Sequence, residues 1–124
     1  MEERILRIED LVPTECLVPS DVLEEMEKHY DGNVASIDPI IVYARDDGKY
    51  LIDNGNKRSV FLYLEGELLI RGYVHEDPDE LAGLEALAAK AEDFSGVKTI
   101  ADLAEKVVPR DEYDLFMGIL DEHD

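Results

Sequence analysis

The apolar positions in the first part of the chain fall into short runs with the length of β-strands. Arg4–Ile8 and Glu67–Val74 are largely apolar, and Ile40–Tyr43 is apolar at every position, which is typical of a strand covered on both faces. Asp46-Asp47-Gly48 is a hairpin signal that returns the chain antiparallel into Lys49–Ile52. The pattern therefore predicts a small mixed β-sheet.

A first helix interrupts these strands. Glu9–Pro19 contains two prolines and reads as an extended connection. Ser20 or Asp21 is then expected to cap a helix, with Glu24 in capping-box register after Asp21. The helix should end at Asp31-Gly32-Asn33. Its buried stripe is predicted to contain Leu23, Met26 and Tyr30.

After residue 76 the pattern becomes helical. An amphipathic helix opens near Pro78-Asp79 and is expected to be broken by Asp93–Gly96. Its apolar positions are Leu81, Leu84, Leu87, Ala88 and Ala91.

Two further helices are predicted near the C-terminus. Thr99, with Asp102 three residues later, can cap a helix through Ala101–Val108, which Pro109 ends. Asp111–Leu120 forms the last one. Its apolar face contains Tyr113, Phe116, Met117 and Leu120. The two helices have the length and break of a helix-turn-helix.

These elements predict an α+β fold, a small mixed sheet with flanking helices followed by a helical tail. We expect residues 1–75 to form the core and residues 76–124 to form a tail packed on it, within one compact domain. A chain of 124 residues, 45% hydrophobic, has the size and composition of one ordinary globular domain.

The charge is strongly negative. Thirty-one acidic against twelve basic residues give a formal net charge of −19, of which residues 76–124 contribute −11. Such a charge repels polyanions, so it argues against a large nucleic-acid footprint, and DNA reading by the last helix is not expected. That helix is better suited to packing, or to contact with a protein partner or a second copy of the chain.

The N-terminus shows no apolar core of a signal peptide, and no apolar run has the length of a membrane span. The one cysteine, Cys16, rules out an internal disulfide and suits a reducing compartment. We therefore expect a cytoplasmic protein that does not bind membranes.

Tyr50–Gly66 carries the candidate chemistry. A short strand, Tyr50–Ile52, is followed by the turn formers Asp53–Asn56 and then by a helix that ends at Gly66. Lys57 and Arg58 lie in the first helical turn, where the helix dipole disfavours cations unless an anion shares the site. Phosphate is the usual anion there. The alternative is that both cations point into water and balance acidic neighbours.

The candidate phosphate site contains Gly55, Asn56, Lys57, Arg58 and Ser59. Asp53 is a supporting candidate that caps its own turn, or else holds a metal or the two cations. The three histidines, at positions 29, 75 and 123, lack the spacing of metal ligands, and the sequence shows no dedicated metal cage.

Over roughly residues 4–75 the chain resembles the ParB/sulfiredoxin superfamily. The resemblance lies in the order and spacing of several pieces. They are Pro39–Val42, the hairpin Asp47-Gly48, Tyr50–Ile52, the box Gly55-Asn56-Lys57-Arg58, and the helix and strand through Gly66 and Val74. The resemblance implies that the box at the helix N-terminus holds the phosphates of a nucleotide.

The box departs from two branches of that superfamily. Chromosome-partitioning ParB proteins carry Gly-Glu-Arg-Arg, whereas Asn56 stands here in place of the glutamate and Lys57 in place of the first arginine. Their second box has no counterpart in Asp77–Phe94, so a CTP-dependent clamp is not expected. Sulfiredoxins place their catalytic cysteine beside the glycine, whereas Cys16 lies in another segment, so sulfinic-acid reduction is not expected either.

A third branch, the free-serine kinases and related archaeal proteins, matches in part. Their Pro-x-Glu signal is present as Pro13-Thr14-Glu15, and the resemblance implies that Glu15 is the base acting on a substrate hydroxyl. Their Asp-Gly-His-His-Arg box is matched by Asp53, Gly55 and Arg58, but Asn54 intervenes and both histidines are absent.

We therefore expect a domain that binds a nucleotide or phosphorylated small molecule at Gly55–Ser59, with or without phosphoryl transfer or nucleotide hydrolysis. Mg²⁺ held by acidic ligands such as Glu15 or Asp53 could accompany the nucleotide. The alternative is a non-catalytic protein-interaction or regulatory module that keeps the box as architecture. A ParB-like nuclease or DNA-binding protein is a second alternative, which the net charge of −19 disfavours.

Overall fold

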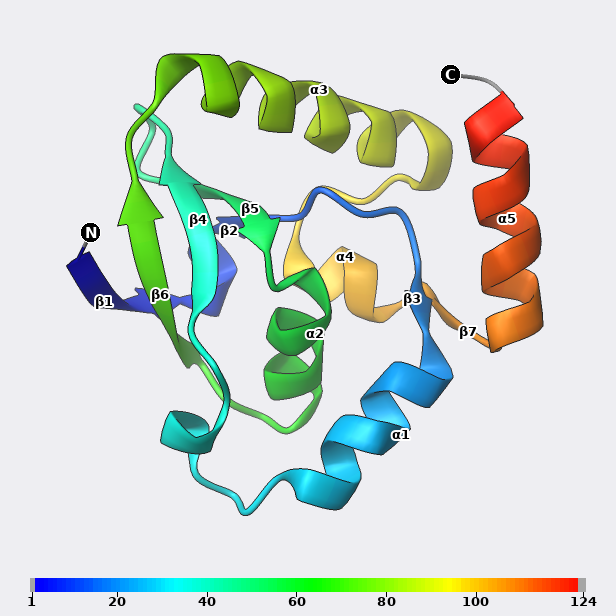
Figure 1. The fold of residues 1–124 in the computed structure, drawn as a ribbon, viewed down its shortest axis with the longest axis horizontal. Coiled ribbons are helices and arrows are strands. Elements are labelled where there is room, and N and C mark those ends of the chain that lie inside the picture. Colours follow the sequence, from blue (N-terminus) through cyan, green and yellow to red (C-terminus); the bar gives the residue numbers. More distant parts are fainter. Residues whose placement is uncertain (1, 123–124) are drawn as a thin grey trace.

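The computed structural model describes residues 2–122, and a mixed five-stranded sheet forms one side of it (Figure 1). The pairings alternate between antiparallel and parallel across the sheet: β1/β6 and β4/β5 are antiparallel, whereas β6/β4 and β5/β2 are parallel. In spatial order the strands are β1 (Glu2–Arg7), β6 (Leu69–His75), β4 (Ile40–Ala44), β5 (Tyr50–Asn54) and β2 (Leu11–Val12).

The predicted hairpin is confirmed. β4 returns into β5 through a tight turn in which Arg45 N–H donates to the Lys49 carbonyl at 2.9 Å. Gly48 adopts φ +84° there, a left-handed conformation that glycine takes without strain. Ile40, Val42 and Ile52 are fully buried. The continuous apolar run was thus correctly interpreted as a central strand.

Within residues 2–122 five helices lie beside the sheet and across one end of it (Figure 1). α3 crosses one end of β4 and β5, while α2 lies at the centre of the molecule and packs against α1 and α4 (Figure 1). Their bounds are α1 (Ser20–His29), α2 (Asn56–Leu64), α3 (Pro78–Ser95), α4 (Ile100–Ala104) and α5 (Arg110–Glu122). Two 3₁₀ turns, at Ile8–Asp10 and Val34–Ser36, complete the fold. The α+β class predicted from the sequence is confirmed.

The core draws on both parts of the chain. Ile52 and Val60, from β5 and α2, belong to one buried cluster with Ala91, Ile100 and Leu103 from the region after residue 76. The stripe predicted for α1 packs against the same cluster through Leu23, Met26 and Tyr30. From α5, Leu120 belongs to the cluster, and Phe116 and Met117 pack against it. α3 extends to Ser95, two residues past Asp93, where the predicted break starts, and Gly96 caps it with φ +72°.

The predicted helix Ala101–Val108 is wrong in its second half. α4 ends at Ala104, and Val107–Val108 form a short strand, β7, that pairs in parallel with β3 (Val18–Pro19). Two adjacent β-branched residues favour extended backbone, and β3 supplies the partner for them. A strand therefore separates α4 from α5, so these helices do not form the helix-turn-helix that their lengths suggested.

Of the helix caps predicted at α1 and α4, one is confirmed and one is wrong. The box of Thr99 and Asp102 at α4 is confirmed in both directions. The cap predicted at Ser20 or Asp21 is wrong, because Pro19 occupies the N-cap position and Ser20 is already helical. The Asp21 carboxylate instead accepts two hydrogen bonds from Arg110 of α5, each 3.1 Å long. This distant partner competes with the local cap.

None of the helices within residues 2–122 combines the length and the apolar character needed to cross a membrane.

Candidate functional site

The turn between β5 and α2 depends on Gly55. This residue has φ +124°, and a Cβ built on it would lie 2.2 Å from Ile40 Cγ2 and 2.6 Å from Ile40 Cβ. The backbone at the start of α2 therefore passes directly over β4, at a distance that excludes every side chain. The glycine is required by both conformation and space.

Asn56 joins this turn to the loop that contains Pro13-Thr14-Glu15. Its side chain is buried, with Oδ1 accepting from Thr14 N–H at 2.9 Å and Nδ2 donating to Thr14 Oγ1 at 3.0 Å. Thr14 Oγ1 in turn donates to the Ile52 carbonyl at 2.7 Å. These three bonds hold the loop across the N-terminus of α2. The sequence pattern predicted Asn56 as a member of the phosphate site and as a departure from the ParB box, but it did not predict these bonds, because Thr14 and Asn56 are 42 residues apart.

Lys57 and Glu15 meet as a consequence of this clamp. Lys57 Nζ donates to Glu15 Oε1 and Oε2, both at 3.1 Å. The side chains of Lys57 and Glu15 retain 30% and 32% of their exposure, so both remain accessible to solvent. The structure thus brings together the two charged residues that the sequence placed in separate motifs.

The Arg58 side chain bonds to residues before β4 and at the end of β5, and not to the Glu15 loop. Its Nη1 donates to the carbonyls of Asp38 and Pro39 at 3.1 and 3.0 Å, and its Nη2 donates to Asn54 Oδ1 at 3.0 Å. Burial lowers the pKa of Arg58 from its ordinary value, against the opposing charge of Asp38, but a guanidinium stays protonated at neutral pH. Arg58 therefore braces the segment that leads into β4.

The remaining predicted residues lie in different surroundings. Ser59 is buried, and its hydroxyl donates to the Gly55 carbonyl at 2.8 Å, so it is bonded within its own helix. Asp53 is exposed near the end of β5. Burial raises the pKa of Tyr43, and the charges of Glu80 and then of Asp53 add to this effect.

Within residues 2–122, the first backbone N–H groups of α2 have no side-chain cap. Along the nine-residue helix the first backbone bond of the helical pattern runs from Ser59 N–H to the Gly55 carbonyl, at 2.9 Å. The N–H groups of the first turn, from Asn56 to Arg58, precede it, and no side chain in the described part of the chain caps this end. Unpaired donors and the positive end of the helix dipole are what an anion binds.

Glu15 also lines a hollow of about 300 Å³ between its loop, α3 and α5. It is lined by Thr14, Glu15, Cys16 and Leu17, by Leu87 and Lys90, and by Tyr113, Met117 and Leu120. Burial raises the pKa of the Cys16 thiol, partly offset by a hydrogen bond with Ser95 and by the charge of Lys90. The thiol is therefore protonated at neutral pH, which makes it a weak nucleophile.

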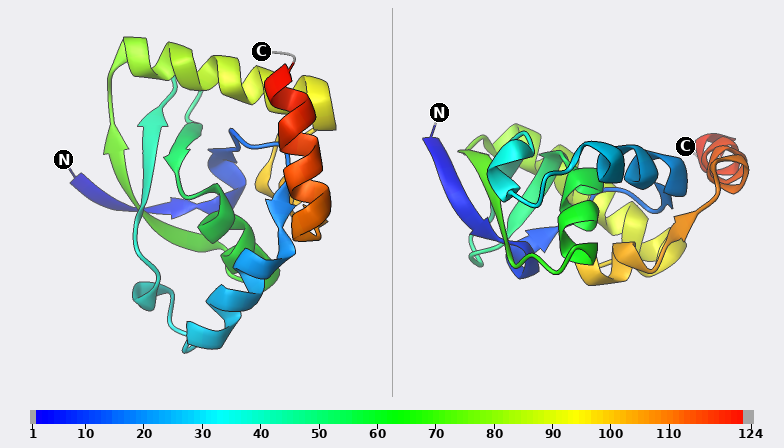
Figure 2. Two further views of the ribbon diagram at one scale, coloured as in Figure 1. Left: turned by 45° about the vertical axis from the view of Figure 1, so that its right-hand side comes forward. Right: turned by 90° about the horizontal axis from the view of Figure 1, so that it is seen from below.

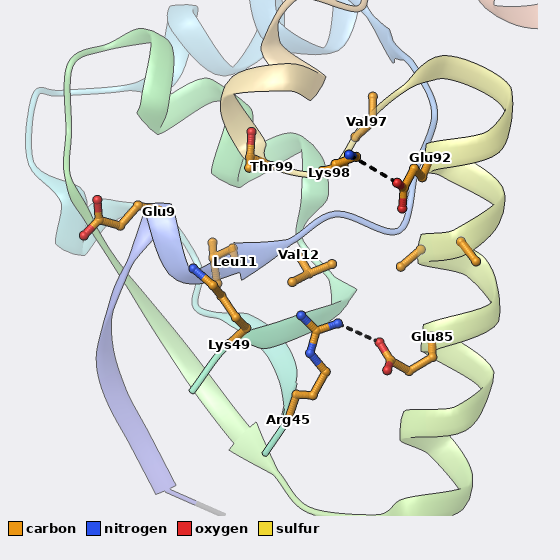
Figure 3. Close-up of a pocket in the computed structure, with 12 residues that line it drawn as sticks. Glu9, Leu11, Val12, Arg45, Lys49, Glu85, Glu92, Val97, Lys98 and Thr99 are labelled. Carbon is orange, nitrogen blue, oxygen red and sulfur yellow. Dashed lines mark hydrogen bonds and ion pairs between the residues drawn. The ribbon is translucent and has the colours of Figure 1, made fainter. Parts of the chain in front are cut away.

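A second hollow, of about 430 Å³, contains several charged side chains that the sequence did not single out (Figure 3). Arg45 points across it to Glu85 of α3, with 2.9 Å between Nη1 and Oε1. Lys98 and Glu92 form another pair at 3.4 Å. These cations face carboxylates, as Lys57 does, but the N-terminus of α2 also offers an anion the uncapped N–H groups of its first turn.

A metal site is not apparent in the described residues, among which no group of three or more His, Cys, Asp or Glu side chains is arranged to hold an ion. His29 bonds to Glu25 at 3.1 Å, and His75 stacks on Tyr43 with 5.2 Å between ring centroids. His123 lies outside the described residues.

Comparison with known proteins informs the fold alone. No protein-family model matches the sequence, and no relative among curated proteins does. Among solved structures the chain is similar to protein Atu1540 from Agrobacterium tumefaciens, with 17% sequence identity and a TM-score of 0.60. The match covers 83% of this chain and 61% of that one, so the chain spans less than two thirds of the length of its structural neighbour.

Proposed function

We propose that the protein binds the phosphate group of a nucleotide or phosphorylated small molecule at the N-terminus of α2. The observation that carries the proposal is the Thr14–Asn56 clamp, which holds Glu15 beside Lys57 at a helix end with uncapped N–H groups. A phosphate seated there would accept from the N–H groups of the first turn. Lys57 would supply the countercharge.

The Lys57–Glu15 pair supports a specific mode of binding. The net charge of −19 repels anions in general, and the bond to Glu15 keeps Lys57 from acting as an isolated positive charge. Lys57 would stay paired with Glu15 until a ligand binds, and would then pair with the phosphate group of the ligand instead. If Mg²⁺ accompanies the nucleotide, Glu15 is the residue here that would share it with the phosphates, as is usual for this ion.

Phosphoryl transfer is an extension of the same proposal, supported by the resemblance to the free-serine kinases. Glu15 would take the proton of a substrate hydroxyl, whose oxygen attacks the terminal phosphorus while the bond to the bridging oxygen breaks and the nucleoside diphosphate leaves. Lys57 and the N–H groups of α2 would neutralise the transferring group. Positioning and electrostatic stabilisation are most of what this chemistry asks of a protein.

The second candidate function is a non-catalytic interaction or regulatory module. The contacts of Gly55, Asn56 and Arg58 favour it, because each of these residues already has a role in holding the fold together. Under this interpretation the box persists as architecture, and a partner binds elsewhere.

Thermal-shift measurements against a panel of nucleotides and inorganic phosphate, with and without Mg²⁺, separate the two candidates. A ligand that binds the folded chain raises its midpoint temperature, by an amount that grows with the logarithm of one plus the ratio of free ligand concentration to Kd. We expect a shift for at least one nucleotide, reduced in Lys57→Ala and unchanged in Lys28→Ala, a control lysine exposed on α1. The absence of any shift across the panel would leave the interaction module.

A further inference from the structure

β1 lies at the edge of the five-stranded sheet and at the margin of the molecule, opposite α5 (Figures 1 and 2). It pairs with β6 on one side over all six of its residues. Within residues 2–122 no strand pairs with its other side. A row of backbone donors and acceptors is therefore open to a further strand.

Several exposed side chains near this edge are large and apolar. Ile5 is 64% exposed, Leu68 79% and Leu69 47%. Leu68 and Leu69 lie between two adjoining hollows of about 630 and 540 Å³, the second of which Ile5 also lines. Contiguous exposed apolar side chains of this kind mark a surface that contacts another molecule.

We propose that β1 pairs antiparallel with β1 of a second copy of the chain, around a two-fold axis at Ile5, so that the two sheets become one. Charge favours this occupant. Glu2, Glu3, Arg4 and Arg7 make β1 neutral, whereas the whole chain carries −19. Two copies that repel one another elsewhere meet here without a like-charge penalty.

The register follows from the geometry of antiparallel strands. Along an edge strand every second residue points its N–H and C=O away from the sheet, and in a new antiparallel pair these residues must lie opposite one another. When β1 pairs with a second β1, a two-fold axis between two residues would break this rule, so the axis must pass through a residue. An axis at Glu3 or Arg4 would bring identical charges together, and Leu6 faces the core.

An axis at Ile5 gives complementary pairs on both sides. Ile5 meets Ile5 of the second copy, and Glu3 of each copy meets Arg7 of the other. By the alternation of the strand these three residues share one face, opposite to that of buried Leu6. Arg7 can change partner, since its contact with Glu9 at 3.3 Å joins two side chains that are each about 70% exposed. Glu3 accepts from Arg71 at 3.1 Å through Oε1, and its second carboxylate oxygen can accept from Arg7 of the other copy.

The pairing predicts a self-association that depends on the order of charges. Arg7→Glu sets acid against acid across the axis, and Glu3→Arg sets base against base. Each variant alone should dissociate the dimer. In an equimolar mixture of the two variants, every cross-axis pair again joins an acid to a base, so a mixed dimer should form.

Sedimentation velocity on the full chain, from low micromolar to several hundred micromolar concentration, tests the proposal. We expect a concentration-dependent dimer in the wild type, weakened roughly tenfold or more in each single variant and restored in the mixture. Lys28→Glu, with the same charge change as Arg7→Glu but located on α1, should leave the dimer unchanged. Far-ultraviolet circular dichroism confirms that each variant is folded.

Three results would each overturn the proposal. They are a wild type that stays monomeric over this range, a dimer that Arg7→Glu weakens no more than Lys28→Glu does, and single variants that dissociate but do not associate when mixed.

Discussion

The ammonium group of Lys57 lies 3.1 Å from both carboxylate oxygens of Glu15, although 42 residues separate them in the chain. The Glu15 carboxylate and a bound phosphate would therefore compete for the ammonium group of Lys57. Because of this competition, substitutions of Glu15 and of Lys57 should change phosphate affinity in different ways.

Neutralising Glu15 should strengthen phosphate binding. In Glu15→Gln, Lys57 loses its internal partner and the ligand no longer faces a carboxylate, so affinity for the best nucleotide should be retained or rise several-fold. Lys57→Ala should lower it. If the protein also transfers phosphate, Glu15→Gln should reduce turnover by about 10²–10⁴-fold, the usual contribution of a positioned base. Titration calorimetry and a turnover assay read the two effects separately, and lost affinity in Glu15→Gln would assign Glu15 to Mg²⁺ or to the loop.

Arg58→Ala should affect the stability of the fold. The substitution leaves the carbonyls of Asp38 and Pro39 without their charged donor, and a hydrogen bond to a charged group is worth about 1.5–3 kcal/mol. Phosphate binding should fall as well, because the brace holds β4 under the turn at Gly55. Urea unfolding measures the first effect. Lys57→Ala is the matched control, expected to cost about 1 kcal/mol or less; equal losses in both variants would remove the bracing role from Arg58.

Gly55→Ala should be severely destabilising, by about 3 kcal/mol or more, since it combines φ +124° with a Cβ 2.2 Å from Ile40. The control is Gly83→Ala, within α3, where a Cβ would meet nothing within 4 Å. There alanine should stabilise the helix by about 0.5–1 kcal/mol. Thermal or urea unfolding of both variants checks the pair, and similar stabilities would contradict the close approach at Gly55.

Glu65→Gln should stabilise the protein at neutral pH and not in acid. A hydrogen bond with the Glu27 carboxyl group, burial, and the charges of Glu27 and Glu67 raise the pKa of Glu65 above its ordinary value of 4.5. A raised carboxyl pKa opposes folding where the group is ionised, and this cost vanishes as pH falls below the value in the unfolded chain. The midpoint temperature of Glu65→Gln should exceed that of the wild type at pH about 7 and converge with it below about pH 4.

Glu24→Gln removes the same single charge from an exposed position on α1, the helix that also carries Glu27. Its effect should be smaller at neutral pH. A gain in Glu24→Gln as large as that in Glu65→Gln would trace the effect to net charge rather than to the pair of carboxyl groups.

The full chain should not bind duplex DNA at physiological salt. The region after residue 76 carries −11, and α5 contains Arg110 as its one basic residue, which already contacts Asp21. A protein that binds DNA must neutralise several phosphates. Fluorescence anisotropy with a labelled duplex checks this, and micromolar binding that weakens as salt is raised would show the prediction to be wrong.

The sequence by itself determined the elements whose signals are local. The apolar run at Ile40–Tyr43, the turn at Asp47-Gly48 and the Gly55-to-Gly66 segment identified β4, the hairpin and α2, because strand, turn and helix preferences act between residues a few positions apart. The same holds for the box of Thr99 and Asp102, whose partners are three residues apart. The sequence also singled out Glu15 and Lys57 individually.

The tertiary structure decided what depends on distant partners. Val107–Val108 became a strand because β3 lies beside it, and Asp21 turned from its helix to Arg110, 89 residues away. Asn56 holds Thr14 across 42 residues, and Arg58 reaches back to Asp38 and Pro39 instead of outward. A polar side chain near the surface has several partners of comparable energy within its own segment, so packing of the whole chain selects among them.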